Sequence, residues 1–171
     1  MDTFEAIAAR RNVREFTDRP ISDDDLDRIL EAGRRAPSAS NRQWWDLVVC
    51  TGREQLRALG TVWRGAGHVP GSAATIAVVA PKQTEPMLAD LLQFDLGQMT
   101  MSLILAATDL GIGTCHSAVG DQTRAREILG FPEDRFCALL LALGYPAGRP
   151  IAPLKRHNRR PIGEVVHRGG W

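Results

Sequence analysis

The longest regular pattern of apolar positions in the chain runs over residues 85–110. Apolar side chains recur there at spacings of four or three residues, which is the period of an α-helix: Leu88, Leu92, Leu96, Met99, Leu103, Ala106 and Leu110. Residues 99–107 carry no charge on any side, so this helix has no face suited to water. The pattern predicts a long central helix, capped by Thr84, ended by Gly111 and covered on all sides. Because so short a chain has few other elements, we expect a second copy to cover part of it.

Shorter patterns on both sides of this helix predict further helices and strands. Capping residues ahead of short periodic segments predict helices over residues 2–9, 22–36, 53–59 and 121–130. Apolar runs predict strands over residues 46–50, 75–80 and 136–143, with an extended segment over residues 113–119. Helices and strands interleave without an internal repeat or a dividing linker. The sequence therefore predicts a single α+β domain over residues 1–171, arranged as a three-layer α/β/α structure.

Composition and charge narrow the functional classes. The chain has 171 residues and a net charge of +1, so it lacks the excess positive charge that a general polyanion binder needs. No uncharged apolar run approaches the roughly 20 residues of a membrane span, and no signal peptide opens the chain. Cys50, Cys115 and Cys137 lie in apolar runs and are interpreted as reduced core thiols. We expect a soluble, cytoplasmic protein that binds neither nucleic acid nor membranes.

Two basic segments stand out in a chain that is otherwise near neutral. Arg10, Arg11 and Arg14 follow the first helix, and a basic run covers residues 155–160. Each segment alone has a plain interpretation, as a solvated surface cluster or as a disordered basic tail. The apolar residues that follow the second run favour an ordered, docked tail. If the two clusters meet, they form a site for a dianion such as a phosphate monoester, because arginine binds phosphate in a bidentate way.

A third polar segment, residues 36–43, is a loop by composition. Ser38, Ser40 and Asn41 offer hydroxyl and carboxamide groups that can hydrogen-bond to the edge of a heteroaromatic ring. Asn41 is equally suited to be an ordinary turn residue. The pattern of this loop alone leaves both interpretations open.

Taken together in chain order, the segments resemble the FMN-dependent nitroreductase family over essentially the whole chain, as a short form. Each motif is loose, but six in the right order are jointly specific. The motifs are residues 10–16 (RRNVREF), residues 36–43 (APSASNRQ), residues 95–97 with 103–107 and 110–115, residues 128–132 (ILGFP), residues 143–146 (LGYP) and residues 159–162 (RRPI).

The resemblance implies a nitroreductase-like fold, with a mixed, mainly antiparallel sheet flanked by helices and the central helix at a dimer interface. It implies a homodimer with FMN bound between the subunits. The cofactor-binding residues that it implies are Arg10, Arg11, Asn12, Arg14, Arg159 and Arg160 of one subunit, Pro37, Ser38, Ser40 and Asn41 of the other, and His116, Ser117 and Ala118 along the flavin ring.

The resemblance also implies the reaction. NADPH or NADH delivers hydride to flavin N5 and leaves, and a flat, electron-poor acceptor such as a nitroaromatic or a quinone then takes the electrons, in a ping-pong cycle. Because the flavin does the chemistry, we assign no catalytic side chain, and we expect no metal. Arg14 is the cation that we expect near the N1/C2=O edge, and His116 is interpreted as a structural residue.

Departures from the family pattern leave alternatives open. Asn12 replaces a serine and Trp44 a proline, and Met101-Ser102 stands where many members carry Gln-Asn. Few residues separate Ala80 from the central helix, which predicts a small lid or an open site with Trp44, Trp45 and Trp63 as the nearest large aromatics. A dehalogenase is disfavoured, because the lid tyrosine and lysine have no counterpart. The alternatives are a flavin-binding sensor or a specialised flavin-modifying protein without general reductase turnover.

Overall fold

The computed structural model describes residues 1–153 and 158–171, and a four-stranded sheet forms its middle layer. The strands are β1 (Asp46–Cys50), β2 (Ala74–Pro81), β3 (Gly113–Ser117) and β4 (Arg135–Gly144). Their order is β1-β2-β4-β3, and all neighbours pair antiparallel. An isolated parallel bridge joins Asn12 to Thr114 at the start of β3. The predicted strands and the central place of the run 136–143 are confirmed.

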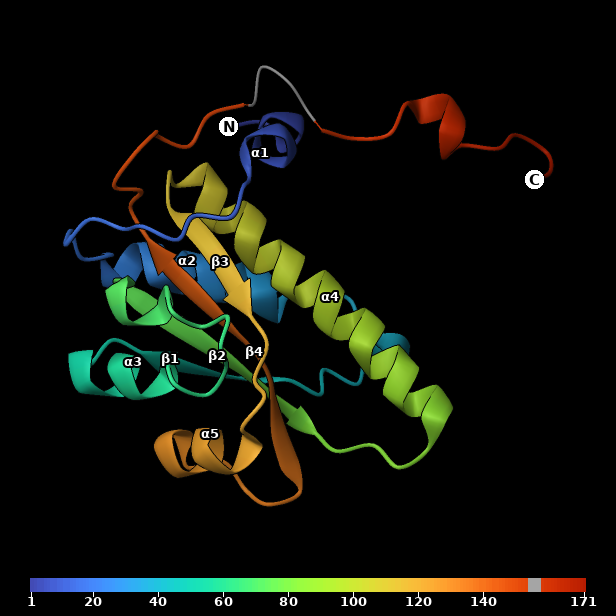
Figure 1. Ribbon diagram of the computed structural model, residues 1–171. Helices are drawn as coiled ribbons and strands as arrows, with labels where there is room; N and C mark the ends of the chain where they lie inside the picture. Colours follow the sequence, from blue (N-terminus) through green and yellow to red (C-terminus); the bar gives the residue numbers. More distant parts are fainter. Residues whose placement is uncertain (154–157) are drawn as a thin grey trace.

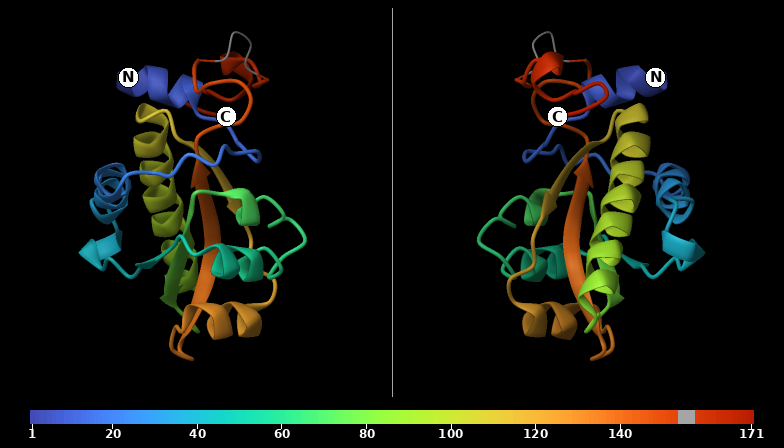
Figure 2. Two further views of the ribbon diagram at one scale, coloured as in Figure 1. Left: turned by 90° about the vertical axis from the view of Figure 1, so that its left-hand side faces the viewer. Right: turned by 90° about the vertical axis from the view of Figure 1, so that its right-hand side faces the viewer.

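Helices cover both faces of this sheet (Figures 1 and 2). One face packs against α2 (Asp23–Arg34) and α4 (Pro86–Asp109), and the other against α3 (Arg53–Leu59) and α5 (Gln122–Leu129). The helix α1 (Thr3–Ala9) lies near the C-terminal end of α4, and three 3₁₀ turns complete the list: η1 (Ala39–Asn41), η2 (Val69–Gly71) and η3 (Ile162–Glu164). The predicted α+β class with three layers is confirmed.

Most helix ends follow the sequence signals. Asp2 forms a reciprocal capping box with Glu5, and Ser22 and Asp121 cap α2 and α5. The predicted cap of α4 at Thr84 is wrong. Glu85 takes that position, and its carboxylate accepts the N–H groups of residues 87 and 88 at 3.2 and 3.3 Å. The reason is Pro86, which holds the preceding residue in an extended conformation and so fixes it as the cap.

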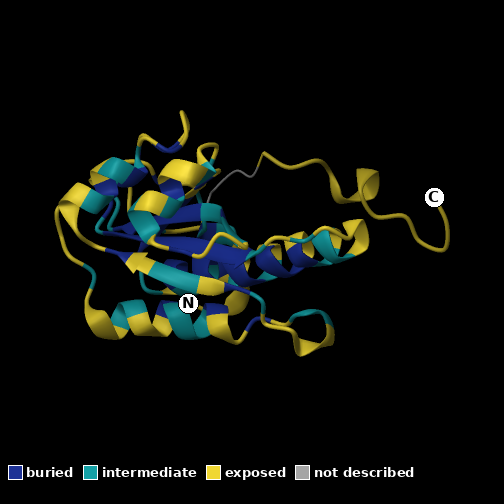
Figure 3. Ribbon diagram, turned by 90° about the horizontal axis from the view of Figure 1, so that it is seen from below, coloured by how far each residue is buried: buried dark blue, intermediate teal, exposed yellow. Residues whose placement is uncertain are grey.

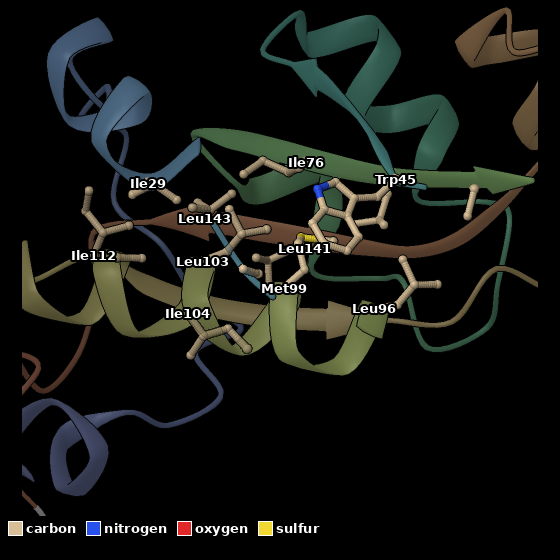
Figure 4. Packing of buried hydrophobic residues seen from close by; sticks show 14 of the residues in the cluster. Ile29, Trp45, Ile76, Leu96, Met99, Leu103, Ile104, Ile112, Leu141 and Leu143 are labelled. Atoms are coloured by element: carbon tan, nitrogen blue, oxygen red, sulfur yellow. The ribbon is translucent and has the colours of Figure 1, made fainter. Parts of the chain in front are cut away.

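One side of α4 forms the centre of the core between the helices and the sheet. Met99 and Leu103 are fully buried and point at Leu141 and Leu143 of β4 (Figure 4). Figure 3 shows the central strands and this side of α4 as buried. Burial of this kind supplies most of the free energy that favours folding.

The outer side of α4 differs from the expectation that the helix is covered on all sides. Phe94 is 67% exposed and Met101 is 42% exposed, with Leu105 half-buried on the same side. These residues lie seven and four positions apart, so they form an apolar stripe that no element of residues 1–153 and 158–171 covers. A single copy of the chain therefore leaves one face of its central helix open.

The cysteines lie where the sequence predicted. Cys50, Cys115 and Cys137 are buried free thiols. Burial raises the pKa of Cys50 to about 11 and that of Cys137 to about 12. At neutral pH these thiols stay protonated, which makes them poor nucleophiles and poor metal ligands. The interpretation as reduced core thiols is confirmed.

The predicted docking of the C-terminal tail is wrong for the single chain. Beyond β4 the tail leaves the body and extends past α1 (Figure 1). Ile162, Val165, Val166 and Trp171 are all exposed, because no described part of the same chain lies against them.

Within the described ranges, 1–153 and 158–171, no helix has the length and hydropathy needed to cross a membrane.

Candidate functional site

The arginine segment runs beside the first residues of β3. The Val13 N–H donates to the Thr114 carbonyl at 2.9 Å, and Asn12 forms the parallel bridge to the same residue. Gly113 permits this close approach, since a Cβ there would lie 2.6 Å from a Val13 methyl group. In extended backbone alternate side chains share a face. Arg10, Asn12 and Arg14 therefore point to one side, and Arg11 and buried Val13 to the other.

A shallow cavity of about 260 Å³ opens at this segment, and its basic lining includes Arg11, Arg14 and Arg149. The Arg11 guanidinium donates to the Arg149 carbonyl. Burial, and then the nearby Arg149 charge, lower the pKa of Arg11. Sequence reasoning missed Arg149. It is a lone arginine in a Gly-Arg-Pro turn, and it lies 138 residues from Arg11 along the chain.

The arginines in this cavity form no ion pair among the described residues, although Glu15 also contributes to the lining. The ion pairs that the described residues form involve other arginines, such as Arg34, Arg35, Arg124 and Arg135. The buried Nε of Arg11 also lacks a hydrogen-bond partner among these residues. Three guanidinium groups around one carboxylate leave an excess of positive charge, which is suited to an anionic ligand.

The segment expected to face a flavin ring lies at the end of β3. His116 and Ser117 are its last two residues and pair with Leu141 and Leu140 of β4, so they belong to a strand and not to a turn. His116 is exposed, whereas Ser117 is buried and donates its hydroxyl to the Ala118 carbonyl at 3.0 Å. This strand end and the arginine segment share Thr114 as a neighbour. The structure brings these two predicted parts together.

The loop between α3 and β2 braces this strand end, and sequence reasoning missed its role. The Val62 carbonyl accepts the N–H groups of Gly120 and Asp121 at 3.1 and 2.9 Å. Buried His68 donates from Nε2 to the Cys115 carbonyl at 3.1 Å, since a carbonyl can only accept. Residues 115–121 are thus held at both ends by one loop, which keeps their backbone in a fixed position.

The environment of His68 predicts a pH dependence of stability. Desolvation by burial lowers the pKa of His68, and the charges of Arg14 and His116 act in the same direction, against the smaller opposing effect of its backbone hydrogen bonds. The folded state then keeps the ring neutral, while the unfolded chain takes up a proton near the ordinary pKa of about 6.5. The unfolded state binds more protons, so stability falls as the pH drops below about 6.5 towards the lower folded pKa.

We expect the urea midpoint of the wild type to decrease between pH 7.5 and pH 5.5. His68→Gln, which removes the titrating ring, should reduce that dependence, and His167→Gln in the exposed tail should not. An unchanged pH profile in His68→Gln would contradict the assignment.

The loop over residues 37–43 has an unusual backbone. Ser40, Asn41 and Gln43 all have positive φ, at 50°, 54° and 47°, a conformation that costs a non-glycine residue roughly 1–2 kcal/mol. The Ser38 hydroxyl accepts the Gln43 N–H at 3.0 Å, and the Gln43 carboxamide donates to the Asn41 carbonyl and side-chain oxygens at 3.2 and 3.1 Å. Strain of this kind is concentrated at functional sites.

This loop and the arginine segment lie far apart in one chain. The loop is attached to α4 at Asp95, in the middle of the helix. The arginine segment follows α1, which is tied to the end of α4 by the Met1–Asp109 ion pair, and lies beside the start of β3. Asp95 and Asp109 are fourteen residues apart, which is about 21 Å along the helix at 1.5 Å per residue. The predicted site residues thus form two half-sites, one at the middle and one near the C-terminal end of α4.

The remaining predicted positions lie apart from both half-sites or outside the description. Arg159 donates to the Asn158 carbonyl at 2.8 Å, and Arg160 donates to the Glu164 carbonyl at 2.5 Å, so both bond within the tail. Residues 155–157 of the predicted basic run lie outside the described residues. Trp45, expected near a flavin, is a core residue that is only 8% exposed; it follows the loop directly and turns into the core beside α4.

The sequence resembles known proteins over most of its length. A sequence model described as the nitroreductase family matches residues 7–90 and 61–145. A candidate NADH dehydrogenase/NAD(P)H nitroreductase of Archaeoglobus fulgidus is 34% identical over 149 residues, which cover 85% of this chain and 86% of that protein. An NADPH-flavin oxidoreductase of Vibrio harveyi is 27% identical over 97% of this chain and 73% of its own length.

Solved structures agree with the sequence matches. The NADPH:FMN oxidoreductase from Vibrio harveyi, complexed with NAD⁺, superposes with a TM-score of 0.86 at 26% identity, covering 100% of this chain and 78% of that chain. A nitroreductase family protein from Clostridium difficile 630 gives the same TM-score at 25% identity, with both chains fully covered.

Proposed function

Because the chain belongs to the nitroreductase family and is an NAD(P)H-dependent flavin oxidoreductase, we propose that it holds FMN between two copies of itself. We further propose that it reduces flat, electron-poor acceptors such as nitroaromatics and quinones. The observation that supports the proposal is the cluster of arginines without ion-pair partners among the described residues, beside the braced end of β3. When bound, FMN would supply the redox chemistry: hydride transfer from NADPH or NADH at N5 and electron transfer to the acceptor, in ping-pong order.

The residues present fit a flavin that carries a phosphate. Arg10, Arg11 and Asn12 would hold the phosphate and ribityl end, since they combine guanidinium donors with an amide and Arg11 has a buried Nε without a partner among the described residues. Arg14 would reach the ring. Arg159 and Arg160 would close on the phosphate from the tail. Pro37, Ser38, Ser40 and Asn41 of the second copy would reach the ring edge. His116, Ser117 and Ala118 would border the ring.

The role of these side chains is to bind, orient and exclude water. Arg14 would place a permanent positive charge near the pyrimidine edge of the ring, where it favours the reduced anion. The brace from Val62 and His68 fixes the backbone along the ring, so hydrogen bonds made there need no reorganisation during the reaction. No side chain is assigned a proton-transfer role.

The open face of α4 supports a homodimer. The apolar stripe borders a groove of about 580 Å³ whose lining includes Pro37, Phe94, Gly97, Met101 and Leu105 and has no charged residue. An exposed apolar face of this kind is typical of an association surface. A second copy, related by a two-fold axis, would bring its residue 37–43 loop to the arginine segment of the first copy, which the loop of the same chain does not reach.

We expect dilute protein to sediment at roughly twice 18.8 kDa. Phe94→Asp places an unpaired charge in the stripe and should shift the population to monomers that have lost FMN, because burying that charge in an interface is costly. Met87→Asp, exposed on the same helix but outside the groove lining, is the control. A folded wild-type monomer that still binds FMN would exclude the shared site.

The central test is the absorption spectrum of the purified protein. We expect a yellow protein whose flavin absorbance is bleached by NADPH or NADH in the absence of oxygen and restored by menadione or a nitroaromatic compound. A yellow protein that neither nucleotide bleaches would favour the sensor or flavin-modifying alternative. A colourless protein that does not take up added FMN would refute the proposal.

The acceptor range follows from the short connection after β2. Only residues 82–85 separate β2 from α4, so little chain is available there to roof a flavin. High specificity requires buried polar groups that the wrong substrate leaves unpaired. We therefore expect modest kcat/KM values spread over many quinones and nitroaromatics. A single acceptor preferred by about 10⁴-fold, the discrimination of a polar-matched pocket, would show that the site is closed.

A further inference from the structure

The carboxylate of Asp95, on α4, is buried where this helix contacts the residue 37–43 loop. It is 1% exposed, and it belongs to no ion pair among the described residues. A buried charge without a counter-ion is retained only where hydrogen bonds stabilise it. The groups that donate hydrogen bonds to Asp95 therefore indicate its structural role.

The two shorter hydrogen bonds come from the two ends of the strained loop, and a third, at 3.5 Å, comes from the Gln98 carboxamide of α4 to Oδ1. Asp95 Oδ2 accepts the Ala39 N–H at 2.9 Å and the Trp44 indole N–H at 2.8 Å. Between these two attachment points lie the three residues with positive φ, Ser40, Asn41 and Gln43. Their strained backbone persists only if surrounding contacts stabilise it. The single oxygen Asp95 Oδ2 accepts hydrogen bonds from the loop on both sides of these three residues.

Trp44 directly follows Gln43, the last of the three residues with positive φ. Its indole N–H donates to Asp95 and so restrains this end of the loop through the side chain. The Arg42 guanidinium lies 4.9 Å from the centre of the indole ring, which adds a cation–π contact to this arrangement.

We propose that Asp95 and Trp44 together position the FMN-binding loop, with the Asp95–Trp44 hydrogen bond restraining the loop after its three residues of positive φ. This inference rests on the proposed function. Asp95 does not touch the flavin; it acts on Ser38, Ser40 and Asn41 by fixing the backbone that presents them to the other subunit's flavin.

The test compares FMN and riboflavin affinities of apoprotein variants by quenching of flavin fluorescence. Asp95→Ala and Trp44→Phe should each raise the Kd for FMN, by at least tenfold and by at least threefold respectively. The Kd for riboflavin should rise by the same factor, because the loop would reach the ring edge and not the phosphate. Asp95→Asn keeps an oxygen that can accept both N–H groups and should restore affinity to within about threefold of wild type.

Leu92→Ala is the matched control, since Leu92 is a core residue one turn from Asp95 on the same helix and makes none of the side-chain hydrogen bonds that hold the loop. It should lower the melting temperature without changing either Kd. If Asp95→Ala and Trp44→Phe behave like Leu92→Ala, the two residues are merely structural and the inference is wrong. If Asp95→Ala does not fold, Trp44→Phe decides alone. Wild-type protein that binds no FMN would refute the proposed function before any variant is compared.

Discussion

Arg10→Ala should weaken FMN binding about tenfold to a hundredfold and leave riboflavin binding unchanged. The side chain has no carboxylate partner within the described residues, and it shares a face of the extended segment with Asn12 and Arg14. Removing one charge-assisted contact to a phosphate costs roughly 1.5–3 kcal/mol, which corresponds to that loss of affinity. Riboflavin lacks the phosphate, so the same substitution should not affect it.

The measurement is titration of apoprotein with each flavin at fixed ionic strength, because salt screens such contacts. Arg124→Ala is the control: it removes an exposed arginine that pairs with Glu127 on α5, away from the arginine segment. Arg159→Ala extends the test to the tail. Equal losses for both flavins would mean that Arg10 acts through the fold. Wild-type affinity for FMN in both variants would identify the two arginine clusters as solvated surface.

Leu103→Ala should lower the free energy of unfolding by about 2–5 kcal/mol. Leu103 is fully buried where α4 crosses α2, and a Cβ on Gly33 would lie 2.6 Å from its Cδ2 atom. The helices are so close here that neither can move in to fill the space left by the lost methyl groups. The cost therefore includes a cavity as well as the lost burial.

Urea unfolding at one fixed protein concentration is the measurement, because association contributes to the stability of a dimer. Met87→Ala truncates a large apolar side chain in the first turn of the same helix, where it is 63% exposed, and should change stability by less than about 0.5 kcal/mol. A Leu103→Ala effect below 1 kcal/mol would mean that the core at this crossing repacks.

Most helix boundaries and strands could be predicted from local sequence patterns. Asp2, Ser22 and Asp121 were recognisable as caps because a cap needs only the next three residues. The stop at Gly130 likewise depends on one left-handed residue. The prediction of Thr84 as the cap of α4 was wrong for an equally local reason, since the proline two positions later makes Glu85 the cap. Strand order was not predictable from such signals, because it is decided by packing between distant segments.

The candidate site was harder to predict from the sequence, because it too depends on contacts between distant segments. Arg10, Asn12 and Arg14 were found through a motif, and their position beside β3 agrees with a shared site. Arg149 and His68 lie in segments without any motif and meet Arg11 and Cys115 across 138 and 47 residues. The grip of Asp95 on the loop also spans about 50 residues. Sequence reasoning expected the tail to dock, whereas the structure leaves its apolar side chains exposed.

The distance between the two half-sites along α4 has a thermodynamic consequence. If one FMN needs residues from both half-sites, it needs two chains, and cofactor occupancy and subunit association become a single linked equilibrium. Each must then strengthen the other by the same factor. Diluting the protein should release flavin even though no bond to it has changed, and excess FMN should hold the subunits together. The concentration of the protein itself then acts as a regulator of how much of it carries cofactor.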